Sequence, residues 1–278
     1  MNTTHLVTPA EAPDDRITLV SIAMLAFIVA DIAHEAFGHI LGFYLAGGRS
    51  ALLSTTRLTE WVKLGDPQWR IFDLGGPFGN LTFAFLAWLV QRFVRSRPLP
   101  LKVFLWLLMA FSLFWAFGYL IFCGVLGRGD WMALIEGTRF LWPGRFLFLG
   151  MGFVLYRASI RLAAKELRWF IPNLDSSAKQ RVARLISISY ISGGAIACAG
   201  AMLDPRGPSE ILNSGALSSF GAALGLLYVP RIFLNLPAKP CLANTRILRD
   251  LPWLIAAAAG AIYYIGILGP GILIWLGH

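Results

Sequence analysis

The sequence has little charge and few cysteines for its length. Of its 278 residues, 14% are charged and 57% are hydrophobic, and the mean hydropathy is +0.65. Soluble globular chains carry about 25% charged residues and roughly 45–50% apolar residues, so a water-soluble fold is excluded. The three cysteines form no C-x-x-C pair, and neither a disulfide framework nor a thiolate zinc site is expected. The sequence also lacks a Walker loop and a dinucleotide fingerprint.

The hydrophobic residues occur in long runs, which predict an all-α, polytopic transmembrane bundle. A bilayer core about 30 Å thick is crossed by about 20 helical residues. About seven spans are therefore expected, and six or eight crossings remain open. Their approximate bounds are residues 17–46, 71–94, 101–126, 141–160, 184–203, 211–230 and 251–276. Residues 1–16 form a polar N-terminal segment without the basic start of a signal peptide, so cleavage is not expected.

The basic residues indicate the partners and the orientation of the chain. The formal net charge is +9, and most Lys and Arg residues lie in the connections between apolar runs, where they meet anionic headgroups. The lipid bilayer is thus the expected partner, and nucleic acid is not, because no basic helix stands free of the membrane. Lys and Arg are about twice as frequent in the connections on the N-terminal side. This bias predicts a multi-pass membrane protein with a cytoplasmic N-terminus.

The first apolar run contains four ionisable residues within nine positions: Asp31, His34, Glu35 and His39. Ionisable side chains are costly in hydrocarbon and commonly mark a functional site. In one interpretation, the two histidines lie near the membrane interface and form hydrogen bonds with loops or headgroups. In the other, they are ligands of a zinc ion.

The spacing of the two histidines bears directly on the zinc interpretation. The familiar metalloprotease motif is H-E-x-x-H, which places both histidines on one face of a helix. Here, His34-Glu35-Ala36-Phe37-Gly38-His39 has one additional residue, which would separate the two imidazoles by about 140° on a regular α-helix. A π-type bulge would remove about 100° of this rotation, and Gly38 provides backbone freedom there. The zinc interpretation therefore predicts an irregular helix between His34 and His39.

These six residues match H-E-x-x-G-H, which resembles the motif of the dipeptidyl peptidase III family of zinc peptidases. Members of that family bind zinc with this expanded helix. Because that family is soluble, the resemblance concerns the geometry of the metal site and not the fold. It implies that the longer spacing is compatible with zinc binding.

A larger resemblance is to the site-2 protease family of intramembrane zinc metalloproteases. That family has H-E-x-x-H in an early transmembrane helix and G-P-x-x-N at the next segment, which Gly76-Pro77-Phe78-Gly79-Asn80 matches. Its third motif contributes a ligating aspartate, usually followed by glycine, whereas here the chain has Gly129-Asp130-Trp131. The resemblance covers roughly residues 20–135. It implies a metalloprotease core of three spans at residues 17–135, followed by an additional transmembrane bundle at residues 136–278.

Membrane topology brings these motifs together independently of the family. The first and third spans run in one direction and the second runs back, so the histidine cluster, residues 73–80 and Asp130 share one membrane face. A catalytic zinc ion takes three protein ligands and keeps one position for water. His34 and His39 are the first two candidates and Asp130 is the third, with Asp73 in reserve and Glu136 as a more distant choice.

Three further residues have predicted roles near the metal. Glu35 is the candidate catalytic base, which takes a proton from water and passes it to the leaving amine. Asp31 lies one turn before the cluster, where its carboxylate could orient a histidine N–H. Asn80 could hold a substrate strand or polarise a carbonyl.

The sequence thus favours a zinc-dependent membrane endopeptidase that cleaves membrane-embedded or juxtamembrane segments of a membrane protein substrate. Two alternatives remain open. One is a catalytically inactive, metal-binding membrane scaffold. The other is a transporter of small solutes or ions whose path is lined by the ionisable cluster of the first span.

Overall fold

The computed structural model describes residues 13–60, 65–93, 98–171, 176–237 and 246–277. Helices are labelled α, or η where they are π-helical or 3₁₀, and strands are labelled β. In chain order, the elements are α1 (Arg16–Ile32), η1 (Ala33–His39), α2 (Ile40–Leu45), β1 (Ser50–Leu53), β2 (Leu58–Glu60), α3 (Asp66–Phe93), α4 (Leu99–Leu126), η2 (Asp130–Leu134), α5 (Leu141–Leu167), α6 (Ser176–Ala201), η3 (Ile211–Gly221), α7 (Gly225–Leu234), α8 (Leu251–Ala261), η4 (Ile262–Leu268) and β3 (Ile272–Trp275).

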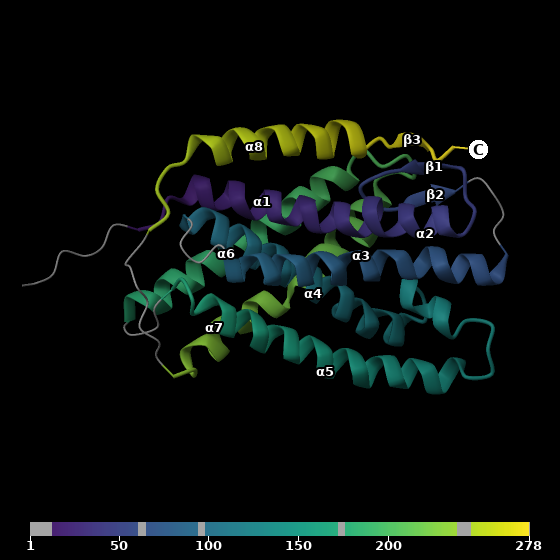
Figure 1. Cartoon of the computed structure of the whole chain (residues 1–278), viewed down its shortest axis with the longest axis horizontal. Coiled ribbons are helices and arrows are strands. Elements are labelled where there is room, and N and C mark those ends of the chain that lie inside the picture. Colours follow the sequence, from purple (N-terminus) through teal and green to yellow (C-terminus); the bar gives the residue numbers. More distant parts are fainter. Residues whose placement is uncertain (1–12, 61–64, 94–97, 172–175, 238–245, 278) are drawn as a thin grey trace, which may run out of the picture.

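The long helices run along one axis of the molecule and form a bundle (Figure 1). Within the described residues, six helices are long and apolar enough to cross a membrane. Their bounds are Arg16–Leu45, Leu99–Leu126, Leu141–Leu167, Ala178–Ala201, Ile211–Leu234 and Leu251–Leu268. The prediction of an all-α transmembrane bundle is confirmed. The predicted second span lies in α3, which is a continuous helix of 28 residues but is not among these six.

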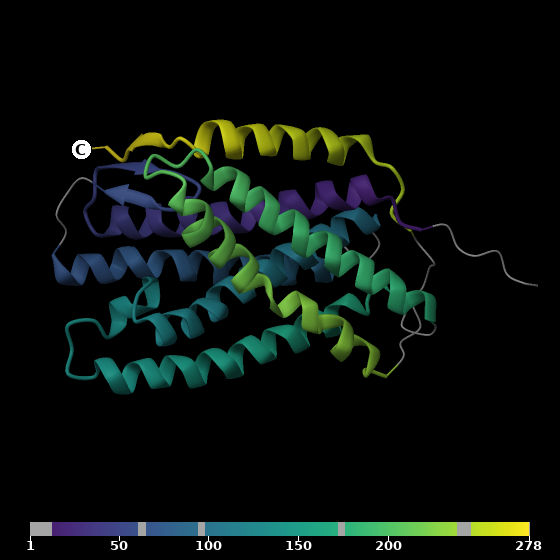
Figure 2. The same ribbon diagram turned by 180° about the vertical axis from the view of Figure 1, so that it is seen from behind.

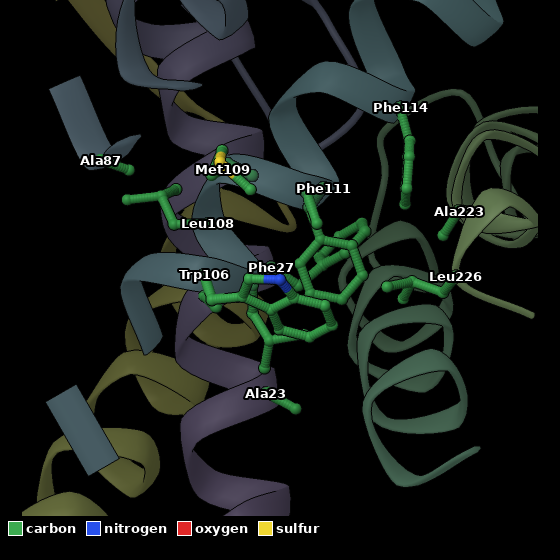
Figure 3. Close-up of a cluster of buried hydrophobic side chains, with 14 of the residues drawn as sticks. Ala23, Phe27, Ala87, Trp106, Leu108, Met109, Phe111, Phe114, Ala223 and Leu226 are labelled. Atoms are coloured by element: carbon green, nitrogen blue, oxygen red, sulfur yellow. The ribbon is translucent and has the colours of Figure 1, made fainter. Parts of the chain in front are cut away.

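Helix α4 occupies the middle of the bundle, where it packs against α1, α3 and α5. Large aromatic side chains fill this region, and Figure 3 shows Phe27 of α1 close to Trp106 and Phe111 of α4. The Phe27 and Phe111 rings pack edge to face with centroids 5.5 Å apart, an arrangement that aromatic pairs prefer. Trp106 Nε1 donates to the Ala163 carbonyl of α5 at 2.9 Å. This packing fixes the positions of the helices that carry the histidines and Asp130.

A small antiparallel sheet lies at the end of the bundle where α2 ends (Figure 1). Strand β1 is central, pairing with β2 on one side and with β3 on the other, with Ser50 opposite Trp275 and Leu53 opposite Ile272. The prediction of a helical span over residues 251–276 is therefore wrong at its C-terminal end. Its helix ends at Leu268, because proline cannot continue the helix at the Gly269-Pro270-Gly271 break. The β-branched residues that follow favour a strand.

The later helices are packed against the first ones rather than set apart from them. Helix α6 contacts α1, and η3 contacts both α6 and α4. Figure 2 shows α6 crossing the bundle obliquely, beside the chain that leads from η3 into α7. The segments 17–135 and 136–278 thus share one core, and both border the region around His34.

Candidate metal centre

The helix that carries the two histidines is π-helical from Ala33 to His39, which confirms the predicted irregularity. Both imidazoles are buried. Their ring centroids are 4.9 Å apart, with the ring planes nearly perpendicular. The wider turn absorbs the additional residue and brings His34 and His39 to the same side of the helix.

The π-helix lies directly against α3, backbone to backbone. A Cβ atom at either Gly38 or Gly75 would overlap the backbone of the other helix, so this approach requires glycine. The close approach brings Asn80 and the Phe72 carbonyl within hydrogen-bond distance of the histidines. His34 Nδ1 lies 2.8 Å from Asn80 Oδ1, and His39 Nδ1 lies 3.0 Å from the Phe72 carbonyl oxygen.

These contacts determine which nitrogen of each imidazole carries the proton. Asn80 Nδ2 donates to the Ala30 carbonyl at 2.8 Å, which leaves Asn80 Oδ1 as an acceptor facing His34. The partner of His39 is also an acceptor, because it is a carbonyl. Each neutral histidine therefore donates through Nδ1 and has a lone pair on Nε2. This is the state in which histidine binds a metal, with the second nitrogen held by an outer partner.

Asp130 completes the arrangement from the far end of α4. The chain turns there through Gly127 and Gly129, with φ angles of 66° and 109°, and enters the 3₁₀ helix η2. Asp130 Oδ2 then lies 3.1 Å from His34 Nε2 and 3.5 Å from His39 Nε2. Donor atoms about 2.0–2.2 Å from a tetrahedral zinc ion are about 3.3–3.5 Å apart. The two distances from Asp130 are therefore close to the spacing between ligand atoms of one such ion.

Hydrogen bonding and space both fit an ion at this position. Asp130 Oδ2 is buried and has no hydrogen-bond partner among the described residues, although two imidazole nitrogens face it. A buried oxygen without a donor is costly, and a cation would remove that cost. On the α3 side, a Cβ atom at Gly76 would lie 2.5 Å from His39 Nε2 and 2.7 Å from His34 Nε2. The missing side chain of Gly76 leaves that space open.

Glu35 lies beside these three side chains, but it is farther from His34 than two ligand atoms of one zinc ion would be from each other. Its Oε1 atom is 4.0 Å from His34 Nε2, and its Oε2 atom is buried without a partner in the described part of the chain. Ligand atoms of His34, Glu35 and His39 all lie within 4.8 Å of one another. These three residues could hold a metal ion, but Asp130 is closer to both imidazoles, so the geometry favours it as third ligand.

The surroundings keep Asp130 ionised. Burial alone would raise the pKa of its carboxyl group, but positive charge on the facing His39 and His34 imidazoles lowers this pKa well below its usual range. A cation held between the neutral imidazoles and Asp130 would supply that positive charge instead.

The remaining predicted residues lie nearby with different partners. Asp73 and Glu136 line the same cavity as the histidines, but Asp130 is the carboxylate that contacts both imidazoles. Asp31 does not orient a histidine, because both Nδ1 atoms are held by α3, and its carboxylate lies next to Tyr264 instead. Asn80 forms hydrogen bonds across the helix interface, with His34 and with the Ala30 carbonyl.

Three aromatic neighbours of the site were not predicted from the sequence. The Trp115 ring of α4 is stacked on His34, with centroids 5.3 Å apart and planes 13° apart, and Tyr264 comes from η4, far along the chain. Trp115 lies one α-helical turn before Tyr119, which also faces His34. The spacing of these two aromatic residues, at i and i+4 on α4, is the sequence pattern that could have indicated a shared face toward the site.

The candidate metal centre opens into a cavity of about 490 Å³ lined mostly by polar side chains. The turn between β1 and β2, the helices η3 and η4, and the start of η2 all contribute to its walls. A cavity of this size is typical of small-ligand and active sites. Comparisons with protein-family models, with curated proteins and with solved structures find no match to this chain.

Proposed function

We propose that the protein is an intramembrane zinc metalloprotease that hydrolyses peptide bonds in membrane-embedded or juxtamembrane segments of its substrates. The observation that carries the proposal is the convergence of two Nε2 lone pairs and an unpaired Asp130 oxygen beside the Glu35 carboxylate. Three ligands and an adjacent base are the parts that a zinc peptidase needs.

His34, His39 and Asp130 would hold the zinc ion, while Asn80 and the Phe72 carbonyl fix the two imidazoles. A bound zinc ion lowers the pKa of water toward neutrality and polarises a carbonyl group. Glu35 would take a proton from the attacking water and deliver it to the nitrogen of the leaving amine. The stacked Trp115 ring excludes water from one face of His34.

The membrane setting restricts where cleavage takes place. The metal-binding residues lie at the end of α1 and α4 that is next to the sheet, and a helical substrate hides its carbonyl groups in hydrogen bonds. The substrate would therefore enter as an unwound or juxtamembrane segment. With the N-terminus in the cytoplasm, as the basic residues predict, cleavage takes place on the opposite side of the membrane.

The test compares wild-type protein with Glu35→Gln and His34→Ala in lipid vesicles that contain a membrane protein substrate. We expect one zinc ion per chain in the wild type and in Glu35→Gln, and less than one in His34→Ala. Cleavage should fall at least about 1000-fold in both variants, because one lacks the base and the other lacks the metal.

Three results would contradict the proposal. Wild-type protein that is purified without chelators and contains no zinc would exclude the metal centre. Bound zinc without cleavage of any membrane substrate would favour the inactive scaffold, and flux of a solute that is lost in Glu35→Gln would favour the transporter.

A further inference from the structure

Four deeply buried, oxygen-bearing side chains line the cavity that also contains the histidines. We call Asp31, Glu35, Thr55 and Tyr264 the oxygen floor. They come from α1, η1, the turn after β1, and η4, and all four line the cavity. Each is at least nine-tenths buried, with exposed fractions of 3% for Asp31, 7% for Glu35, 5% for Thr55 and 1% for Tyr264.

The hydrogen bonds within the oxygen floor are incomplete. The Tyr264 hydroxyl lies next to the Asp31 carboxylate. Glu35 Oε2 and Thr55 Oγ1 have no partner among the described residues, although Thr55 Oγ1 and the Tyr264 ring both lie against Gly200. Unpaired buried oxygens are costly, and these atoms could all accept a hydrogen bond. A ligand with several donors would satisfy them.

The charge balance of the cavity indicates the sign of that ligand. Two of the four side chains of the oxygen floor, Asp31 and Glu35, are carboxylates. Among the described residues, no Lys or Arg forms an ion pair with either of them, whereas Glu210, elsewhere in the cavity, is paired with Arg206 at 2.9 Å. Buried carboxylates without a cation are unfavourable, and a cation bound at the oxygen floor would remove that cost.

We propose that the oxygen floor binds a primary ammonium group of the substrate, next to the peptide bond that is cleaved. This inference rests on the proposed protease function. An ammonium group carries one positive charge and three N–H donors, which matches Asp31 and the unpaired oxygens of Thr55 and Glu35. A hard divalent cation such as calcium takes six to eight oxygen ligands, more than this floor offers. The ammonium group can come from a substrate α-amino terminus or from a lysine side chain.

The first experiment measures cleavage of matched peptides by the full-length protein in vesicles. One set has lysine or the isosteric, uncharged norleucine at a single position, and the other has a free or an acetylated N-terminus. In the wild type, kcat/KM should be about 100-fold higher for the ammonium form in one of the two sets. A preference in the lysine set assigns the side chain as the source, and a preference in the terminus set assigns the α-amino group.

Variants then locate the effect. In Asp31→Asn, which keeps the size of the side chain and its contact with Tyr264, the preference should fall below about 3-fold while cleavage of the uncharged peptide is retained. Tyr264→Phe should lower the preference about 10-fold. Glu210→Gln is the matched control, because it removes a carboxylate from another part of the same cavity and should leave the preference unchanged.

A binding measurement keeps the inference independent of cleavage. The thermal unfolding midpoint of zinc-loaded protein is measured with n-butylammonium and with n-butanol. Only the ammonium compound should raise the midpoint, and the increase should vanish in Asp31→Asn. If no peptide is cleaved but this shift is found, the protease proposal fails and the ammonium site stands. Equal cleavage of charged and uncharged peptides, equal losses of both in Asp31→Asn, or a shift that survives Asp31→Asn would overturn the ammonium site.

Discussion

Two buried polar clusters lie at opposite ends of α3, and they differ in how their hydrogen bonds are satisfied. At the far end, Glu166 Oε1 accepts from Arg92 Nη2 at 2.6 Å and from Trp88 Nε1 at 3.3 Å. The Arg92 guanidinium also lies over the Trp88 ring, 4.6 Å from its centroid. Here the charges cancel and the donors meet acceptors within the protein.

At the beginning of α3, the cluster of His34, Glu35, His39 and Asp130 is not satisfied in the same way. Its acceptors outnumber its donors, and buried oxygens of Glu35 and Asp130 lack partners within the described part of the chain. The Glu166 carboxylate is as buried as that of Glu35, so the burial of a carboxylate by itself does not identify a functional site. The difference in satisfied hydrogen bonds does, because an incomplete buried cluster implies a ligand.

The largest expected effect is on metal binding, through Gly76→Ala. The added methyl group would lie 2.5–2.7 Å from the Nε2 atoms of His39 and His34, so the imidazoles must turn away. Zinc affinity should fall by more than about 100-fold, beyond the usual cost of disturbing an outer partner. Metal analysis after dialysis against a graded chelator series measures this. Gly150→Ala, with nothing within 4 Å of its Cβ position, is the control. Equal zinc affinity in both variants would disprove the assigned ion position.

The satisfied cluster should respond through stability and not through metal binding. Arg92→Ala leaves the Glu166 carboxylate buried without its cation, which should lower the free energy of unfolding by about 3 kcal/mol. Denaturant unfolding in detergent measures this change, and the zinc content should stay at that of the wild type. The double variant Arg92→Met with Glu166→Met should recover most of the stability, because it removes both charges together. A loss of zinc in Arg92→Ala would contradict the conclusion that only the cluster around His34 binds metal.

A smaller effect on the metal is expected from Asn80→Ala. This change removes the acceptor that holds Nδ1 of His34, while the ligands themselves remain. Zinc affinity should fall about 10–100-fold, as for other outer partners of ligating histidines. Competition with a zinc-sensitive dye measures the affinity. Thr82→Ala, on an exposed part of the same helix, serves as control, and unchanged affinity in Asn80→Ala would show that Asn80 does not position His34.

The smallest effect concerns a third polar group at the mouth of the cavity. Burial raises the pKa of Asp204, but hydrogen bonds from Arg206 and Thr56 lower it by more than burial raises it. The pKa of Asp204 is therefore below its usual value. The ionised carboxylate therefore stabilises the fold above about pH 4, and this contribution is lost as the pH falls through the lowered pKa. Asp204→Asn should cost less than about 1 kcal/mol at pH 6.

Thermal unfolding of chelator-treated protein at pH 6 and at pH 3 tests this pH dependence. The difference between wild type and Asp204→Asn should be smaller at pH 3, where the wild-type carboxylate begins to take up a proton. A difference that is the same at both values would show that the ion pair with Arg206 does not contribute through its charge.

The sequence by itself determined the features that depend on local pattern. Long apolar runs predicted the transmembrane helices, because about 20 apolar residues suffice to cross a bilayer. The spacing from His34 to His39 predicted the π-helix, because the period of a regular helix is incompatible with a shared ion. The alternating direction of consecutive spans brought Asn80 and Asp130 to the same membrane face as the histidines. Each of these inferences needs only neighbouring residues or the order of the helices.

Tertiary structure decided which atoms meet. Asp130 rather than Asp73 reaches the imidazoles, because the turn through Gly127 and Gly129 aims its side chain at them. Asp31 pairs with Tyr264, a residue more than two hundred positions away, and the strand β3 pairs with β1 across a similar separation. Such contacts depend on the distances and rotations of packed helices, and side-chain packing between those helices sets them. Hydropathy and local spacing do not specify that packing. Which residues contact each other across the helices could therefore be learned only from the folded chain.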